Sequence, residues 1–214
     1  MGWRSKMTFL PMFMEGLTPE MVRRAEEELG ETPEVRIQAL KDLRRLINAE
    51  ADFRPLMDDA FLVRFLRAKK YNVQKAFNTL RNFYTFKVRY SKVLTDFKPS
   101  EVKTVLEMNN LLIVPRRLPD GTAVGILRMG DFDMDKATSD DFVAACFVCT
   151  EIGIEPEATQ VCGAVLVFDW NNFTLRMIKH FASPTLLLRV VRLVQVRNVS
   201  DFFLFITPNF KCCL

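Results

Sequence analysis

Two cysteines three residues apart, Cys146 and Cys149, have the spacing of a redox-active thiol pair. A cysteine reacts as its thiolate, which needs a nearby positive charge or a helix N-terminus to lower the thiol pKa. This pair instead lies among apolar residues with no basic neighbour. We therefore interpret both cysteines as buried thiols that fill a core or line a cavity.

Other patterns that suggest chemistry are incomplete. The alternating aspartates of residues 131–135 begin like a calcium loop, but Lys136 replaces the glycine that makes the sharp turn and Phe142 replaces the bidentate glutamate. The one histidine, His180, has no acid or nucleophile at a suggestive spacing, and an esterase that uses it is the remaining enzymatic alternative. Glycine-rich phosphate loops and nucleophile elbows do not occur. We expect a protein that is not an enzyme and holds no metal or cofactor.

The composition is that of a globular protein. The chain has 214 residues, of which 49% are hydrophobic and 26% charged, with 19 Phe and 10 Met. No stretch approaches the roughly 20 apolar residues of a membrane span, and the N-terminus lacks the features of a cleaved signal peptide. Because the five cysteines are an odd number, we expect free thiols and a reducing, cytoplasmic location.

Positive charge is concentrated in one part of the chain. Residues 60–95 contain nine Lys and Arg and no Asp or Glu, although the net charge of the whole chain is only +4. Such a block favours an anionic partner, either a membrane surface or a nucleic acid. The alternative interpretation is a solvated face of a helical bundle.

The first half of the sequence predicts four short helices. Thr-Pro-Glu occurs at 18–20 and at 32–34, and each copy supplies an N-cap hydroxyl, a proline at the first helical position and an acid in the first turn. Asn72 can cap a further helix, because apolar residues recur after it at helical spacing. We expect an N-terminal extension with one helix over 1–31 and a helical domain over 32–99.

Strand and helix patterns alternate after about residue 100. A short helix with Val102, Val105 and Leu106 leads into the apolar run LLIVP, and a turn follows it. The runs AVGILRM and GAVLVFDW predict two strands, and the second is continuous enough to be buried on both faces. A long helix that begins at Thr138 or Ser139 separates these two strands, and Ser183 with Pro184 begins a last helix. This order predicts an α/β fold, in which a mostly parallel sheet flanked by helices follows a small helical bundle.

Several ordered blocks resemble one family. The segment FLVRFLRAKKYNVQKAFNTLRNF resembles the helical N-terminal part of the CRAL-TRIO (Sec14-like) lipid-transfer family. The segments PDGTAVGILRMGDFD and CGAVLVFDWNNFTLRMIKHFASPTLLLRVVRLVQ resemble the first strands, the Asp-ended central strand and the following helix of its lipid-binding domain. The resemblance covers about residues 32–195 and is to the branch of alpha-tocopherol transfer, retinaldehyde-binding and clavesin proteins.

The resemblance implies a function and a set of partners. It implies a cavity that holds a small hydrophobic lipid, such as a tocopherol, a retinoid or a phosphoinositide-like lipid, and transfers it between membranes. It also implies a cytoplasmic monomer that docks transiently on an anionic membrane, including one that contains phosphoinositides, and that has no nucleic-acid partner. The Phe- and Met-rich composition agrees with apolar cavity walls.

Positions carried over from the family predict the residues that line this cavity. They are Leu127 and Met129 on one strand, Leu166 and Phe168 on the central strand, Val143, Cys146, Phe147, Thr150 and Ile154 on the long helix, and Leu187, Val190, Leu193 and Val194 on the last helix. An ordinary core role is the alternative interpretation for each position. Thr150 has a hydroxyl that can orient a ligand headgroup, whereas the Cys146 thiol is a weak donor.

The resemblance ends after Gln195. The family continues with another buried strand, an amphipathic gate helix and basic residues for phosphoinositide headgroups, but residues 196–214 form a divergent tail. We therefore expect a partial lipid-binding domain over 100–195 whose C-terminal part is missing, with FFLFI as an edge or replacement strand. A cavity without its gate would be open on one side. The alternative function is thus a membrane or partner adaptor that keeps the fold but does not transport lipid.

Overall fold

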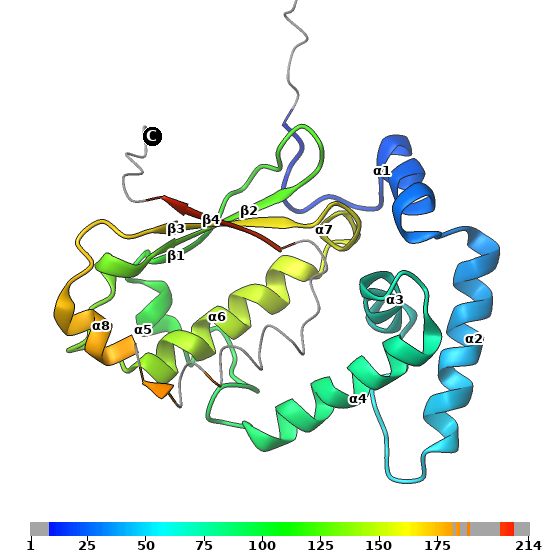
Figure 1. Ribbon diagram of the computed structural model, residues 1–214, viewed down its shortest axis with the longest axis horizontal. Coiled ribbons are helices and arrows are strands. Elements are labelled where there is room, and N and C mark those ends of the chain that lie inside the picture. Colours follow the sequence, from blue (N-terminus) through cyan, green and yellow to red (C-terminus); the bar gives the residue numbers. More distant parts are fainter. Residues whose placement is uncertain (1–8, 182, 185–187, 189–201, 208–214) are drawn as a thin grey trace, which may run out of the picture.

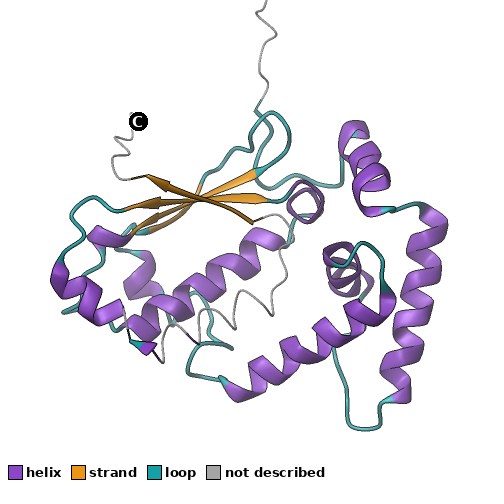
Figure 2. Ribbon diagram, viewed as in Figure 1, coloured by secondary structure: helices purple, strands orange, loops and turns teal. Residues whose placement is uncertain are grey.

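The computed structural model describes residues 9–181, 183–184, 188 and 202–207 of the chain. The first half contains α1 (Pro19–Arg24), the π-helical turn η1 (Ala25–Leu29), α2 (Pro33–Ala49), α3 (Asp59–Ala68) and α4 (Val73–Arg89). The second half contains α5 (Lys103–Leu106), β1 (Leu111–Ile113), β2 (Ala123–Arg128), the 3-10 turn η2 (Met129–Asp131), α6 (Ser139–Ile154), α7 (Glu157–Cys162), β3 (Ala164–Asp169), α8 (Leu175–Phe181) and β4 (Phe202–Thr207). A sheet flanked by helices therefore follows a helical region (Figure 2), which confirms the predicted fold class.

Polar caps start the N-terminal helices where the sequence predicts them. The Thr18 hydroxyl accepts a hydrogen bond from the Met21 amide at 3.3 Å, and the Thr32 hydroxyl accepts one from the Val35 amide at 3.2 Å. The side chain of Asn72 accepts a hydrogen bond from an amide in the first turn of α4. Each such cap satisfies a backbone donor that the helix leaves unpaired, and its loss typically costs about 1 kcal/mol.

Helices α2, α3 and α4 enclose one hydrophobic core. Its members come from the apolar stripe of each helix and include Leu40, Leu43, Ile47, Leu62, Leu66, Phe77, Leu80 and Phe83, all of them buried. Burial of one such side chain contributes about 1.5–3 kcal/mol. The predicted helical bundle is therefore present.

The sheet has four strands in the order β1-β2-β3-β4. β1 pairs antiparallel with β2, whereas the β2–β3 and β3–β4 pairs are parallel. The sheet is therefore mostly parallel, as predicted, and the predicted edge strand FFLFI forms β4. In Figure 1, α6 lies along one face of the sheet, and α2, α3 and α4 lie beside this layer.

The prediction that β3 is buried on both faces is wrong. Residues 164–168 are only half buried, and Asp169 alone falls in the buried class. Successive residues of a strand point to opposite faces, so both faces of β3 are partly accessible. Helix α6 lies over one face without closing it, and no described helix covers the other face in Figure 1. A continuous apolar run therefore does not by itself identify a strand covered on both sides.

The long helix α6 joins the two halves of the molecule. It begins with a capping box in which the Thr138 hydroxyl accepts from the Asp141 amide at 3.2 Å and the Asp141 carboxylate accepts from the Thr138 amide at 2.9 Å. Phe147 in its middle stacks on Phe86 of α4, with ring centroids 6.2 Å apart. The last predicted helix, which begins at Ser183, lies largely outside the described residues.

Candidate functional site

A cavity of about 130 Å³ lies between α6 and the sheet. Its lining comes from β1, β2, β3, one face of α6, the start of α7 and the N-terminal segment, and comprises Met12, Leu111, Leu112, Ile113, Ala123, Val124, Gly125, Ile126, Leu127, Cys146, Cys149, Thr150, Gly153, Ile154, Thr159, Ala164, Val165 and Leu166. Among these residues, two threonines carry the only side-chain oxygens. The cavity is therefore suited to an apolar molecule with few polar atoms.

Helical and strand periodicity together place these residues around one space. On α6, residues 146, 149–150 and 153–154 follow one another at intervals of three or four and so share a face. Gly125 lies opposite Leu166 in the parallel β2–β3 register, so one side chain rather than two fills that position. Gly153 likewise presents no side chain, and a Cβ added there would meet no atom within 4 Å. The small residues leave the volume that the cavity occupies.

The predicted lining residues fall into three groups. Leu127, Cys146, Thr150, Ile154 and Leu166 line the cavity. Met129 and Phe168 belong to the core around Phe142, and Val143 and Phe147 belong to the core of the helical region. Leu187, Val190, Leu193 and Val194 lie outside the described residues.

Sequence reasoning missed the end of the cavity formed by the N-terminal segment. Met12 is 1% exposed and lines the cavity, and its amide donates to the Pro115 carbonyl at 2.9 Å. The Arg117 amide in turn donates to the Leu10 carbonyl at 2.7 Å. These contacts join residues about a hundred positions apart, so no periodicity within a short window could have predicted them.

Arg117 is a fully buried cation beside this end of the cavity. Its exposed fraction is 0%, and its Nε and Nη2 atoms donate to the Met12 carbonyl at 3.1 and 2.7 Å. Its Nη1 atom donates to the Gly121 carbonyl at 3.1 Å, and Nη2 also donates to the Thr159 hydroxyl at 2.8 Å. Burial lowers the pKa of Arg117, but an arginine keeps its proton. A positive charge held by neutral oxygens therefore lies behind Thr159.

The cavity thiols are protonated. Burial raises the pKa of both Cys146 and Cys149, and proximity to Cys149 raises the pKa of Cys146 further. A protonated thiol is a poor nucleophile and a poor metal ligand. Cys146 and Cys149 therefore serve as soft, weakly polar wall groups in this arrangement.

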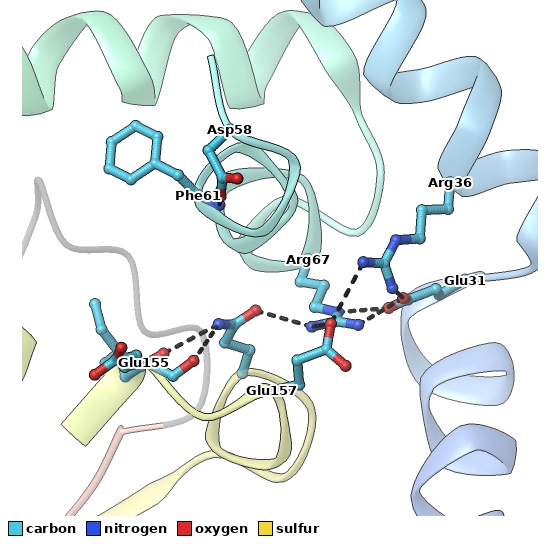
Figure 3. A network of polar contacts seen from close by, with 9 residues as sticks. Glu31, Arg36, Asp58, Phe61, Arg67, Glu155 and Glu157 are labelled. Carbon is cyan, nitrogen blue, oxygen red and sulfur yellow. Dashed lines mark hydrogen bonds and ion pairs between the residues drawn. The ribbon is translucent and has the colours of Figure 1, made fainter. Parts of the chain in front are cut away.

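An ion-pair network connects the helical region to the α7 segment beside the cavity (Figure 3). Arg67 of α3 is 1% exposed, and its Nε and Nη2 atoms each donate to a Glu31 oxygen at 2.7 Å. On the α7 side, Arg67 Nη1 donates to Gln160 at 2.9 Å and lies 3.3 Å from Glu157. Arg36 pairs with both Glu31 and Glu157 at 3.6 and 3.4 Å. A bidentate, shielded pair of this kind holds two elements in a fixed orientation.

A second cleft, of about 360 Å³, lies between α3 and the α6–α7 corner. Three of its residues are acidic (Asp58, Glu151 and Glu155), and its one cation, Arg64, lies 4.2 Å from the Phe61 ring centroid and 3.4 Å from Glu151. The labelled side chains of Asp58, Phe61 and Glu155 appear in Figure 3. Because its walls are charged, this cleft is less suited to a hydrophobic ligand than the cavity beneath the sheet.

Metal-binding clusters and membrane-spanning helices are both absent from the described part of the chain. No cluster of three or more His, Cys, Asp or Glu side chains there has the geometry to hold a metal ion. The helices of the same residues include none with the length and apolar character of a membrane span.

Comparison with known proteins identifies the family. The model of the CRAL/TRIO N-terminal domain matches residues 45–82, and the model of the CRAL/TRIO domain matches residues 107–199. Together the two models span more than half of the chain. The chain therefore belongs to the CRAL-TRIO family, as the motifs predicted.

Curated relatives share similarity over most of this chain. The human alpha-tocopherol transfer protein-like protein is 31% identical over 186 residues, which are 86% of this chain and 54% of the relative. Clavesin-1 of Rattus norvegicus is 26% identical over 191 residues, and clavesin-2 of the same species is 29% identical over 182 residues. These matches cover 88% and 82% of this chain, and 54% of each clavesin. The chain thus spans about half the length of the curated relatives it matches.

Proposed function

We propose that this chain binds a small hydrophobic lipid in the cavity between α6 and the sheet and carries it between membranes. The apolar cavity in a CRAL-TRIO chain is the observation that carries this proposal. A relative named for alpha-tocopherol transfer supports the same class of ligand, and tocopherols, retinoids and phosphoinositide-like lipids are the candidates. The chain acts as a binder and carrier, without a chemical step.

The ligand-bound form is wider than the form described here. Ligand sites commonly enclose about 300–1,000 Å³, whereas this cavity measures about 130 Å³, close to the size of an engineered cavity that holds one benzene. A whole lipid therefore requires a wall to move. Met12 forms one end of the cavity and belongs to a segment attached by a few hydrogen bonds, so we place the movement there.

The lysines of the α3–α4 turn and the first turn of α4 support docking on an anionic membrane. Lys69, Lys70 and Lys75 form no ion pair with a described residue, whereas five other cations of the basic block pair with carboxylates. Burial lowers the pKa of Lys69, and repulsion by Lys75 lowers it further. Anionic lipid headgroups would relieve this repulsion.

The proposed organisation follows the sequence. Residues 1–31 form an extension, 32–99 the helical domain, 100–195 a partial lipid-binding domain and 196–214 a divergent tail. We propose that the carrier is a cytoplasmic monomer, associates with membranes transiently and has no nucleic-acid partner.

Filling the cavity tests this function. Gly153 lines the cavity, and the space around an added Cβ is open. We expect Gly153→Leu to reduce the lipid that co-purifies about tenfold, since losing about 60 Å² of buried ligand surface corresponds to about 1.4 kcal/mol. Gly153→Ala is the matched control, because it improves helix propensity by about 1 kcal/mol and leaves most of the cavity empty. The readout is mass spectrometry of an organic extract, beside a mock purification.

The same organic extract distinguishes a lipid carrier from the alternative function, an adaptor that keeps the fold but does not transport lipid. A lipid enriched with the wild-type chain and with Gly153→Ala, but depleted with Gly153→Leu, supports the carrier. A folded monomer with an empty extract contradicts it and favours the adaptor, for which the small cavity volume is the supporting observation. The adaptor predicts salt-sensitive binding of lipid-free protein to anionic vesicles.

A further inference from the structure

The two hydroxyl groups of the cavity differ in what they can offer a ligand. Thr150 Oγ1 donates its hydrogen to the Cys146 carbonyl at 2.7 Å, within the same helix. Its oxygen can therefore accept a hydrogen bond from a ligand, but its hydrogen is already engaged. Thr159 Oγ1 instead accepts a hydrogen bond from Arg117 Nη2 at 2.8 Å, and among the described residues its hydrogen has no acceptor. Thr159 is thus the hydroxyl that can donate to a ligand.

The positive charge of Arg117 beside Thr159 favours a negatively charged ligand group as the acceptor of the Thr159 hydrogen bond. All four hydrogen bonds of the Arg117 guanidinium go to neutral oxygens, which belong to Met12, Gly121 and Thr159. No ion pair joins Arg117 to a carboxylate within the described residues, although the side chain is 0% exposed. An isolated buried charge is costly, and an opposite charge nearby offsets much of that cost. A negatively charged ligand group at Thr159 would supply it.

From this geometry we propose that the ligand is an amphiphile with a carboxylate head. The carboxylate accepts the Thr159 hydroxyl hydrogen in front of Arg117, and the apolar chain extends between α6 and the sheet. This inference rests on the proposed function, because it assigns an orientation and a head group to the lipid in that cavity. One hydroxyl donor suits a carboxylate better than a phosphate, whose additional oxygens would need further donors in an apolar space.

A matched pair of ligands tests the head group. Decanoate and 1-decanol have the same chain length, and titration calorimetry at neutral pH gives the dissociation constant of each for the full chain. We expect decanoate to bind about tenfold more tightly than decanol, since a hydrogen bond to a charged group is stronger than one to a neutral group. Equal affinities would overturn the carboxylate assignment while leaving the proposed function in place. A folded chain that binds neither ligand would also overturn the carboxylate assignment, and the organic extract described above decides the proposed function separately.

Variants of Thr159 test the residue. We expect Thr159→Val to bring the two affinities within about twofold of each other, and Thr159→Ser to retain the preference because it retains the hydroxyl. Thr122→Val is the control, because Thr122 is a buried threonine nearby that does not line the cavity and whose hydroxyl lies 3.4 Å from the Cys162 carbonyl. A preference for decanoate that survives in Thr159→Val would show that another group binds the head. The wild-type comparison decides the head group even where Thr159→Val does not fold.

Discussion

Two buried arginines, Arg67 and Arg117, illustrate two different ways in which this fold accommodates a buried charge. Arg67 and Arg117 are both essentially inaccessible to solvent, yet their partners differ. Arg67 has two carboxylates within ion-pair distance, Glu31 and Glu157. Arg117 has only neutral oxygens among its hydrogen-bond partners. The first arrangement is complete by itself and serves structure, whereas the second can accept a further negative group.

We expect Arg67→Met to lower the free energy of unfolding by about 3–5 kcal/mol, because it leaves the shielded Glu31 with Arg36, 3.6 Å away, as its ion-pair partner among the described residues. Urea unfolding measures the loss. The double variant Arg67→Met, Glu31→Gln should be more stable than Arg67→Met alone, since the unpaired carboxylate is then gone. If the double variant loses as much stability as Arg67→Met and Glu31→Gln lose together, the ion pair does not provide the stabilisation that the geometry indicates.

The cavity thiols predict a loss of stability at alkaline pH. Burial raises the pKa of Cys146 and Cys149 in the folded chain above their ordinary value near 9.0. The folded state therefore keeps protons that the unfolded state releases. The stability that the two protonated thiols contribute is complete below about pH 8.5 and is lost as the pH rises above it. We expect the free energy of unfolding to fall as the pH rises above about 8.5, by on the order of 1 kcal/mol at about pH 9.5 for Cys146, whose pKa is raised most.

Unfolding by urea at several pH values checks this expectation. The double variant Cys146→Ala, Cys149→Ala should lose less stability than the wild type over the same alkaline range. Parallel curves for the two proteins would contradict the assignment to these thiols.

Turns and helix ends determine where the elements of the cavity lie. The turn before β2 places Gly121 at φ +88°, and a Cβ there would lie 2.6 Å from Met21 Cε and 2.7 Å from Cys162 Sγ. The same glycine provides a carbonyl that accepts from Arg117. This turn therefore connects α1, the end of α7 and the buried cation, and its backbone shape matters to all three.

We expect Gly121→Ala to destabilise the fold by about 2–4 kcal/mol, because left-handed strain and steric overlap act together. Gly16→Ala is the matched control, since Gly16 has φ +67° but no atom within 4 Å of an added Cβ. Its cost should be limited to the strain, about 1–2 kcal/mol. Thermal unfolding of both variants measures the difference, and equal losses would show that the overlap relaxes without cost.

Elements with local signals were predictable from the sequence, whereas the closed end of the cavity was not. Thr18, Thr32 and Asn72 start helices through hydrogen bonds to residues three positions away. Helical spacing likewise places residues 146, 150 and 154 of α6 on one face, whereas Val143 and Phe147, expected on the same face, pack in the core of the helical region. The Arg117 bond to Met12 spans 105 positions, and nothing in the local pattern of either residue indicates the other.

The charge distribution of the whole molecule makes a prediction about membranes. The triple variant Lys69→Gln, Lys70→Gln, Lys75→Gln should bind anionic vesicles about 100-fold more weakly, at about 1 kcal/mol per lysine near the surface. The variant Arg81→Gln, Lys87→Gln, Lys92→Gln removes the same charge from residues that pair with Glu50, Asp96 and Glu101. Vesicle sedimentation should show a much smaller effect for this second variant. Equal effects would indicate that net charge, and not the α3–α4 turn, controls binding.

The position of α6 between two cores has a mechanical consequence. One side of the helix contacts the helical region, where Val143 and Phe147 are buried and Phe147 stacks on Phe86. The other side forms a wall of the cavity. A shift of α6 away from the sheet would compress a packed interior, which has low compressibility. We therefore expect α6 to act as a stiff support, and we expect the movement that admits a larger ligand to occur at the end of the cavity formed by the Met12 segment.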